Sequence, residues 1–318
     1  MNRRPKRDDW PTSLRLATRL LDGLGVRQPW RFTGGSALAS IHGHRFSRDA
    51  DLFFSEAPDL LELDEQVQQL GYHTVLSPGH SLKILHDHGH IDLVQSRQIT
   101  TLPTTEMPFE GRMVQREHPA EIVAKKMYFR GSNCTPRDVF DYAMLARRDA
   151  EAWLMGAVAA GYGGVHATRE AMAERRDDFL SYARDEVATP EPFDPPAVWN
   201  AAEQAIASAY PVVLWADVAK QAASTSPYRD EHLERAIARA HAVDPDGGRR
   251  REAVRVMGAL GLDPGEAARA LLEKEFSWKR PGSVSDLAAR TRQALQMPPL
   301  GTEPAEAPSR TGSGGIEP

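Results

Sequence analysis

Three aspartates lie in apolar segments with the length and composition of buried strands. Asp49 and Asp51 stand two residues apart in a run that ends Leu-Phe-Phe, and Asp92 lies in the run His-Ile-Asp-Leu-Val. Side chains alternate along a strand, so Asp49 and Asp51 share one face, where their charges repel unless a cation holds them. Mg²⁺ prefers such oxygen ligands; the alternative is an exposed edge strand with solvated carboxylates. If the strand of Asp92 lies beside the other, all three carboxylates converge.

A glycine–serine turn lies just upstream of these carboxylates. Gly34, Gly35 and Ser36 follow an expected strand, residues 30–33, and precede an expected helix, residues 37–41. Without a Cβ, backbone N–H groups in such a turn can approach a phosphate, and the helix N-terminus favours the same anion. The alternative is a plain strand-to-helix turn. Three acids beside such a loop are typical of two-metal phosphoryl or nucleotidyl transfer, which predicts an NTP and Mg²⁺, with Mn²⁺ as an alternative ion.

The segment Gly34–Phe54 resembles the first motif of the AbiEii/AbiGii-type toxin nucleotidyltransferases, a family of the DNA-polymerase-β-like nucleotidyltransferase superfamily. The family pattern is Gly-Gly-Ser/Thr, a helix, Gly-His-Arg, a serine and then Asp-x-Asp. The resemblance covers roughly residues 15–150, and its further matching segments are residues 43–47, 90–94, 121–130 and 137–142. The chain departs from the family where Ala124-Lys125-Lys126 stands in place of Ala-Glu-Lys, and Lys126 is taken as the matching lysine.

The resemblance implies a role for most of these residues. Asp49 and Asp51 would hold the magnesium ions, and Asp92 would bind the second metal or act as a general base. Lys126 would neutralise charge on the triphosphate; without the resemblance it reads as a solvated lysine on an amphipathic helix. The residues expected to hold the terminal phosphates are Gly34, Gly35 and Ser36.

Arg45 and Asp138 are the remaining candidates. Arg45 either contacts phosphate or forms a salt bridge with Asp49 or Asp51. The resemblance makes Asp138 part of the active site, whereas its residue type alone also fits a capping or surface acid paired with Arg137 or Lys126. Asp141 lies on the same helix face as Asp138, three residues on, and is a weaker candidate.

The elements expected around these residues give an α+β fold. We expect a polymerase-β-like nucleotidyltransferase domain over residues 1–150, with a small mixed sheet and flanking helices. A mostly helical domain follows over residues 151–300, and a disordered tail over residues 301–318. The expected strands are residues 30–33, 49–54, 72–76, 82–86 and 90–95, with a hairpin turn at residues 87–89. The expected helices are residues 10–25, 37–41, 60–70, 121–129, 137–148, 151–161, 168–184, 197–208, 230–241, 249–260 and 264–276.

The amino-acid composition limits which partners and which cellular compartment we expect for this protein. The 318 residues carry 39 Lys and Arg against 44 Asp and Glu, a net charge of −5, which argues against bulk coating of nucleic acid or membranes. Residues 112–148 nevertheless carry eight Lys and Arg against four Asp and Glu, which suits a triphosphate and RNA. The chain has one cysteine, Cys134, expected to be inert. No apolar run is long enough for a membrane span, so we expect a cytoplasmic protein.

Histidines are concentrated before residue 91. Seven of the eleven lie between His42 and His90, including the alternating run His86-Asp-His-Gly-His90. Alternating histidines can bind a transition metal. Because Gly89 places this run at a hairpin tip, we expect these side chains to face solvent instead.

The leading hypothesis is an Mg²⁺-dependent enzyme that transfers NMP from an NTP to an acceptor hydroxyl. By the resemblance it would be the toxin of a toxin–antitoxin or phage-defence pair, with tRNA as the acceptor and a cognate antitoxin as a partner. One alternative is a nucleotidyltransferase that modifies a small molecule of the aminoglycoside kind, or a protein hydroxyl. Another is a catalytically idle nucleotide-binding module, which the retention of Asp49, Asp51, Asp92 and Ser36 argues against.

Overall fold

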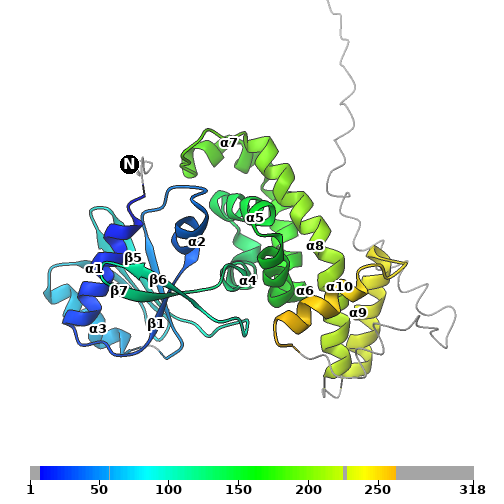
Figure 1. Cartoon of the computed structure of the whole chain (residues 1–318), viewed down its shortest axis with the longest axis horizontal. Coiled ribbons are helices and arrows are strands. Elements are labelled where there is room, and N and C mark those ends of the chain that lie inside the picture. Colours follow the sequence, from blue (N-terminus) through cyan, green and yellow to red (C-terminus); the bar gives the residue numbers. More distant parts are fainter. Residues whose placement is uncertain (1–7, 57, 225–227, 263–318) are drawn as a thin grey trace, which may run out of the picture.

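The computed structural model describes residues 8–56, 58–224 and 228–262, and a seven-stranded mixed sheet forms the centre of its first half (Figure 1). The strands are β1 Trp30–Thr33, β2 Ala50–Phe54, β3 His73–Ser77, β4 Ser81–His86, β5 Gly89–Gln95, β6 Thr105–Phe109 and β7 Arg112–Arg116. Their order in the sheet is β3-β4-β5-β2-β1-β7-β6. β2 runs parallel to β5 and β1 parallel to β7, whereas all other neighbours are antiparallel.

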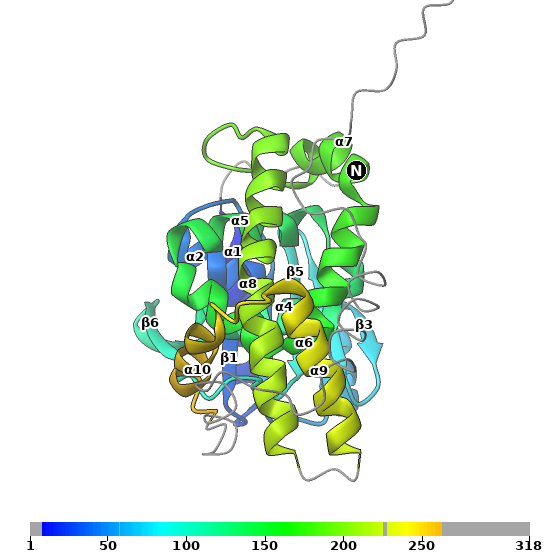
Figure 2. The same ribbon diagram turned by 90° about the vertical axis from the view of Figure 1, so that its right-hand side faces the viewer.

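Helices flank this sheet and then form most of the rest of the described chain. The helices beside the sheet are α1 Trp10–Gly23, α2 Gly34–His42 and α3 Leu60–Gln69. The later helices are α4 Pro119–Arg130, α5 Pro136–Arg148, α6 Ala150–Glu174, α7 Arg176–Glu186, α8 Pro195–Ala223, α9 Arg229–Val243 and α10 Arg250–Ala259, with a 3₁₀ turn, η1, at Gly131–Asn133. Figure 2, turned to face the helical half, shows α8 running along that half with α9 beside it.

Two buried apolar clusters hold these layers together, and α4 belongs to both. The sheet cluster joins α1, α2 and α3 to the inner strands through residues such as Leu14, Phe32 and Leu52. The helical cluster extends from α4 to the end of α10. Ile122 of α4 packs in the sheet cluster, whereas Val123, the next residue, packs in the helical cluster. The sheet and the helical half are therefore joined by packing as well as by the chain; the boundary expected at residue 150 stays a prediction.

Local sequence explains where the helices near the sheet begin. α4 and α5 each have proline in the first turn, where its missing N–H costs nothing. Thr135 accepts a hydrogen bond from the backbone of Asp138, and the Asp138 carboxylate accepts one from the backbone of Thr135, a complete capping box. Asp138 therefore caps its own helix as well as lining the site described below.

The fold class agrees with the expectation, but one hairpin was missed. Strands β6 and β7, which pair with each other at the edge of the sheet, were not expected from the residue pattern. Each contributes one buried apolar side chain, Met107 in β6 and Val114 in β7, and Pro108 interrupts the strand pattern. One buried side chain in five leaves no alternation to detect. The turn between them, Glu110–Gly111, has positive φ at both residues, as a tight hairpin requires.

The helical half differs from the expectation in where its helices end. The helix expected over residues 197–208 continues as α8 to Ala223, through Pro211, because nearly every side chain from Val212 to Ala219 is buried and the segment has no polar face to mark its period. The helix expected over residues 168–184 is divided between α6 and α7 at Arg175. The helix expected over residues 264–276 and the tail over residues 301–318 lie outside the described residues.

None of the helices in the described part of the chain has the length and apolar character needed to cross a membrane.

Candidate active site

The glycine–serine turn forms the first turn of α2 and lies against Asp51. Gly34 has a φ of +72°, and a Cβ at this position would lie 1.9 Å from Oδ2 of Asp51. A Cβ on Gly35 would lie 2.0 Å from Nη2 of Arg45. Neither position has room for a larger residue, and the backbone conformation of Gly34 also disfavours one. Ser36 is buried, and its Oγ lies 2.6 Å from Oγ of Ser47.

The sheet brings the three predicted carboxylates together. Asp51 in β2 and Asp92 in β5 are register partners on adjacent parallel strands, and Asp49 directly precedes β2. We call Asp49, Asp51 and Asp92 the acidic cluster. Burial, together with the charges of Asp92 and Asp49, raises the pKa of Asp51 to about 6. Like charges at short range thus make full ionisation of the cluster unfavourable without a cation.

His90 stands between two of these carboxylates, although the histidines of this hairpin were expected to face solvent. Its Nδ1 lies 3.0 Å from Oδ1 of Asp49 and its Nε2 3.1 Å from Oδ2 of Asp92. Burial alone would lower the pKa of His90, but the hydrogen bonds to both carboxylates raise it to about 9. Burial likewise opposes the shift at Asp92, yet hydrogen bonds from His90 and Lys83 hold its pKa below the usual value.

A second group of charges lies on the other side of the glycine–serine turn. We call Arg45, Lys126, Asp138 and Asp141 the ion-pair cluster. Nζ of Lys126 lies 2.6 Å from Oδ1 of Asp138 and 2.8 Å from Oδ2 of Asp141. Arg45 donates through Nε and Nη2 to the two oxygens of Asp141, at 2.7 and 3.1 Å. Arg45 is therefore paired with Asp141, not with Asp49 or Asp51 as one of the two expectations held.

The ion-pair cluster is buried and electrically balanced. All four side chains are nearly inaccessible to solvent, and His44 adds a further contact, with its Nε2 2.7 Å from Oδ1 of Asp141. Burial opposes ionisation of Asp141, but Arg45 and Lys126 hold its pKa well below the usual value. Two cations and two carboxylates thus neutralise one another, with Arg130 completing the contacts of Asp138 at 3.0 Å.

Lys125, the residue that departs from the family pattern, has a structural environment. Its Nζ lies 2.6 Å from Oε1 of Glu117 and 3.1 Å from Oε1 of Glu121, and 4.7 Å from the ring centre of Phe53. Glu121 in turn accepts hydrogen bonds from the backbone N–H groups of Ile99 and Thr100. Much of the positive charge predicted to serve a triphosphate or RNA is therefore used inside the protein.

The acidic cluster and three members of the ion-pair cluster, Arg45, Lys126 and Asp138, line one cavity of about 310 Å³, which we call the active-site cavity. We call the part lined by the acidic cluster, His90 and Lys83 the acidic end. We call the part lined by Lys126, Arg130, Thr135 and Glu186 the cationic end; Arg137 also lines the cavity and is near enough to Asp49 to help lower its pKa, so the two parts adjoin. All predicted site residues except Gly34 line this cavity, and Gly34 is in contact with Asp51 at its wall. An anionic substrate with several phosphates can therefore lie between Gly35–Ser36 and the cationic end.

The acidic cluster has the donors that a divalent cation needs. No group of three or more His, Cys, Asp or Glu side chains in the described ranges is arranged to hold a metal ion as it stands. His90 accounts for this, because its ring is hydrogen-bonded between Asp49 and Asp92. The three carboxylates nevertheless supply only oxygen ligands and carry excess negative charge, as Mg²⁺ or Mn²⁺ requires.

Several residues of the cavity were not predicted. His90 was detectable, because it lies two residues before Asp92 in a strand and therefore on the same face. Lys83 pairs with Asp92 across the hairpin, and this follows only from the register of β4 with β5. Thr135 and Glu186 reach the cavity from the start of α5 and the end of α7, and no local motif marks them.

A family model defines the class of the protein, which is a nucleotidyltransferase. Residues 19–227 match the family model described as "Nucleotidyl transferase AbiEii toxin, Type IV TA system", and the chain belongs to this family. No curated protein matches the chain in sequence.

Solved structures of nucleotidyltransferase-like proteins are similar in part. The antibiotic-resistance factor ANT(2″)-Ia is 16% identical, with a TM-score of 0.38 over 53% of this chain and 97% of that one. JHP933 from Helicobacter pylori is 14% identical, with a TM-score of 0.40 over 64% and 93%. A nucleotidyltransferase-like antigen from Paracoccidioides brasiliensis is 20% identical, with a TM-score of 0.32 over 59% and 97%.

Proposed function

We propose that this nucleotidyltransferase transfers NMP from an NTP to a hydroxyl of tRNA, using Mg²⁺ bound by Asp49, Asp51 and Asp92, and that it is the toxin of a toxin–antitoxin pair. The observation that carries the proposal is the register of Asp51 with Asp92 on adjacent strands, directly beside the first turn of α2. Excess carboxylate charge at one end of the active-site cavity and cationic groups at the other match a metal–triphosphate substrate.

The phosphates are expected along the wall between α2 and α4. The N-terminus of α2 offers the backbone N–H groups of Gly35 and Ser36 to a phosphate. Lys126 supplies a fixed positive charge, because Asp138 and Asp141 hold its Nζ in place. Arg130 is the more adaptable cation, since its side chain is 52% exposed while bonded to Asp138. Together these groups would stabilise the charge of the leaving pyrophosphate.

The acceptor hydroxyl is expected at the acidic end. Asp92 is held ionised by His90 and Lys83, and 19% of its side chain is exposed, so it can take the proton of an entering hydroxyl. Asp49 and Asp51 would hold Mg²⁺ with Asp92. When bound, the metal lowers the pKa of the attacking hydroxyl and neutralises the α-phosphate.

The acceptor and the biological role rest on the family and on charge. Membership of a toxin family of type IV toxin–antitoxin systems favours growth arrest as the outcome and an antitoxin as a partner. Arg130 and Arg137 at the mouth of the cavity favour a polyanionic acceptor such as tRNA.

The direct test incubates the purified protein with each α-³²P-labelled NTP, Mg²⁺ and total tRNA. We expect label in RNA of tRNA length and none with the Asp51→Asn variant. Asp87→Asn is the matched control, because Asp87 is exposed at the tip of the β4–β5 hairpin and lies outside the cavity; it should keep full activity. Absence of labelled product with every NTP would contradict the proposal.

Further measurements test the metal site, the acceptor and the toxin role one at a time. Mn²⁺ titration followed by electron paramagnetic resonance should show binding to the unaltered protein and none to Asp51→Asn. If the label is recovered in a small molecule or in protein and not in RNA, that molecule is the acceptor in place of tRNA. Induced expression should arrest growth, and Asp51→Asn should relieve the arrest. If both proteins arrest growth alike, the toxicity does not come from nucleotidyl transfer.

A further inference from the structure

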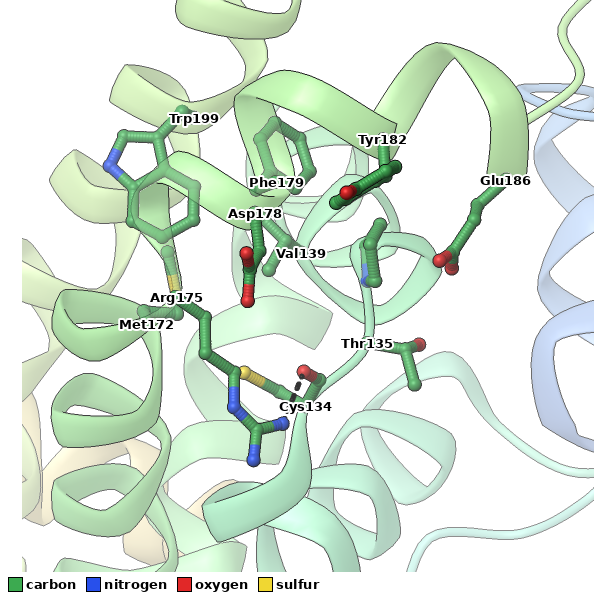
Figure 3. A pocket seen from close by; sticks show the side chains of 11 residues that line it. Cys134, Thr135, Val139, Met172, Arg175, Asp178, Phe179, Tyr182, Glu186 and Trp199 are labelled. Carbon is green, nitrogen blue, oxygen red and sulfur yellow. Dashed lines mark hydrogen bonds between the residues drawn. The ribbon is translucent and has the colours of Figure 1, made fainter.

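A second cavity opens beside the active-site cavity, on the side of α7. It has a volume of about 340 Å³ and lies between the start of α5, the end of α6, α7 and α8 (Figure 3). We call it the side chamber. Thr135 and Glu186 line both cavities, so the two are neighbours that share a wall.

The inner surface of the side chamber is apolar and buried. Phe179 and Trp199 are 2% and 1% exposed, and their ring centres lie 5.2 Å apart. Val139 and Met172 are equally buried, and Cys134 exposes only 4% of its surface. These side chains belong to the apolar cluster of the helical half, so their positions are fixed by packing.

The rim of the side chamber carries an aromatic ring and polar groups. Tyr182 is 57% exposed and is seen at the edge of the chamber in Figure 3. Arg175 donates from Nη2 to Oδ1 of Asn133 and from Nη1 to the carbonyl of Cys134, which holds its guanidinium along the rim. Asp178, one turn further along α7, adds an acceptor. A flat, partly apolar ligand with donors and acceptors on its edge fits this combination, which describes a nucleobase.

Thr135, which lines both cavities, joins the side chamber to the cationic end of the active-site cavity. Oγ of Thr135 donates to Oδ2 of Asp138 at 2.9 Å, and Asp138 holds both Lys126 and Arg130. A group in the side chamber is therefore next to the expected triphosphate. The ribose and base of an NTP are linked to its α-phosphate, which is expected beside Asp49 and Asp51. Arg137, which follows Pro136 of the side chamber, lines the active-site cavity together with these two carboxylates, so the nucleoside also lies within reach of the chamber. A macromolecular acceptor instead needs an open approach, which the partly exposed Lys83 and the β4–β5 hairpin provide at the acidic end.

We propose that the side chamber binds the ribose and base of the NTP substrate, with the base against Tyr182 and its edge facing Arg175 and Asp178. This inference rests on the proposed function, because it assigns a place to the nucleoside of the same substrate. It makes α7 and the start of α8 the part of the chain that distinguishes a nucleotide from a bare polyphosphate.

The test compares two probes that share the phosphates and differ in the nucleoside. Dissociation constants are measured by calorimetry for each of the four NTPs and for inorganic tripolyphosphate, all with Mg²⁺. We expect Tyr182→Ala and Arg175→Gln to weaken the tightest-binding NTP roughly tenfold, the loss of one stacking contact, and to leave tripolyphosphate unchanged. Tyr228→Ala is the control, because Tyr228 is similarly exposed and lines neither cavity; it should bind both probes normally.

A second measurement needs no substitution. Cys134 is the only cysteine of the chain and lies on the wall of the side chamber, so its rate of alkylation by N-ethylmaleimide reports on access to that space. The tightest-binding NTP should slow the alkylation several-fold, whereas tripolyphosphate should not.

The outcomes separate this inference from the function on which it rests. Unaltered protein that binds neither NTP nor tripolyphosphate overturns both. Unaltered protein that binds NTP while the Tyr182 and Arg175 variants bind it equally well, and while Cys134 stays unprotected, overturns the side-chamber assignment alone. The assignment is overturned in that case even if the variants transfer nucleotide poorly, because the chamber would then hold the acceptor.

Discussion

The acidic cluster and the ion-pair cluster lie on either side of the glycine–serine turn and are built in opposite ways. In the ion-pair cluster two cations face two carboxylates, all buried, and the pKa of Asp141 is held well below its usual value. In the acidic cluster His90 pairs with Asp49 and Asp92, and Lys83 with Asp92, while burial with like charges raises the pKa of Asp51 to about 6. The first cluster is complete without a ligand, and the second is not. We therefore expect the first to govern stability and the second to govern binding and rate.

The largest effect is expected when the balance of the ion-pair cluster is broken. Asp141→Asn leaves Arg45 and Lys126 buried with one carboxylate fewer, which should lower the free energy of unfolding by about 3–5 kcal/mol. Urea denaturation followed by circular dichroism measures this change. Asp22→Asn is the control, because Asp22 pairs with Arg112 on the surface with about half of its side chain exposed, and should cost less than about 1 kcal/mol. Equal losses in the two variants would contradict the contrast.

The acidic cluster should respond in rate and not in stability. Asp51→Asn keeps the shape of the side chain but removes a charge that repels Asp49 and Asp92. We expect nucleotidyl transfer to fall roughly a hundred- to thousandfold, the usual cost of removing one charge-stabilising group. The free energy of unfolding without metal should stay the same or rise. A variant that unfolds as readily as Asp141→Asn would show that the acidic cluster is structural.

Added metal should stabilise the protein through the acidic cluster alone. Mg²⁺ or Mn²⁺ at about one hundred times its dissociation constant should raise the free energy of unfolding by about 2.7 kcal/mol. Asp51→Asn should lose this gain, and Asp141→Asn should keep it even though it starts from a lower stability. Thermal melts with and without metal test this, and a gain that survives in Asp51→Asn would place the cation elsewhere.

The smallest effect is expected at acid pH. Because the pKa of Asp141 in the folded protein lies well below its unfolded value near 3.9, its contribution to stability is complete above that value and is lost as the pH falls further. The unaltered protein should therefore lose stability below about pH 4 more steeply than Asp141→Asn. Parallel slopes of unfolding free energy against pH, measured between about pH 5 and pH 2, would contradict the pairing of Asp141 with Arg45 and Lys126.

Sequence alone predicts the acidic cluster better than the ion-pair cluster, for a physical reason. Asp51 and Asp92 lie in strands and Asp49 directly before one, and a period of two predicts which face their side chains take. The Arg45–Asp141 pair joins a loop after α2 to α5, 96 residues away, and no local period encodes that contact. Of the two alternatives for Arg45, the salt bridge to Asp49 or Asp51 is therefore not the one formed, and the phosphate contact stays a prediction.

Helices and strands, too, can be predicted where buried residues recur at a local period. Five strands and most helices were predicted because apolar residues recur at a clear period. The β6–β7 hairpin was missed because one buried residue in each strand gives no period, and the length of α8 because burial on all sides gives none either. The side chamber could not be predicted, since its walls come from α5, α6, α7 and α8 and only their packing makes the space.

The shared position of α4 has a consequence for how the protein comes apart. One helix supplies Ile122 to the sheet cluster and Val123 and Met127 to the helical cluster, so neither can open without exposing apolar surface of the other. The two halves should therefore melt in a single cooperative transition, and the backbone amides of α4 should be among the slowest in the chain to exchange with deuterium. The helix that carries Lys126 to the active-site cavity is thus also among the last to unfold.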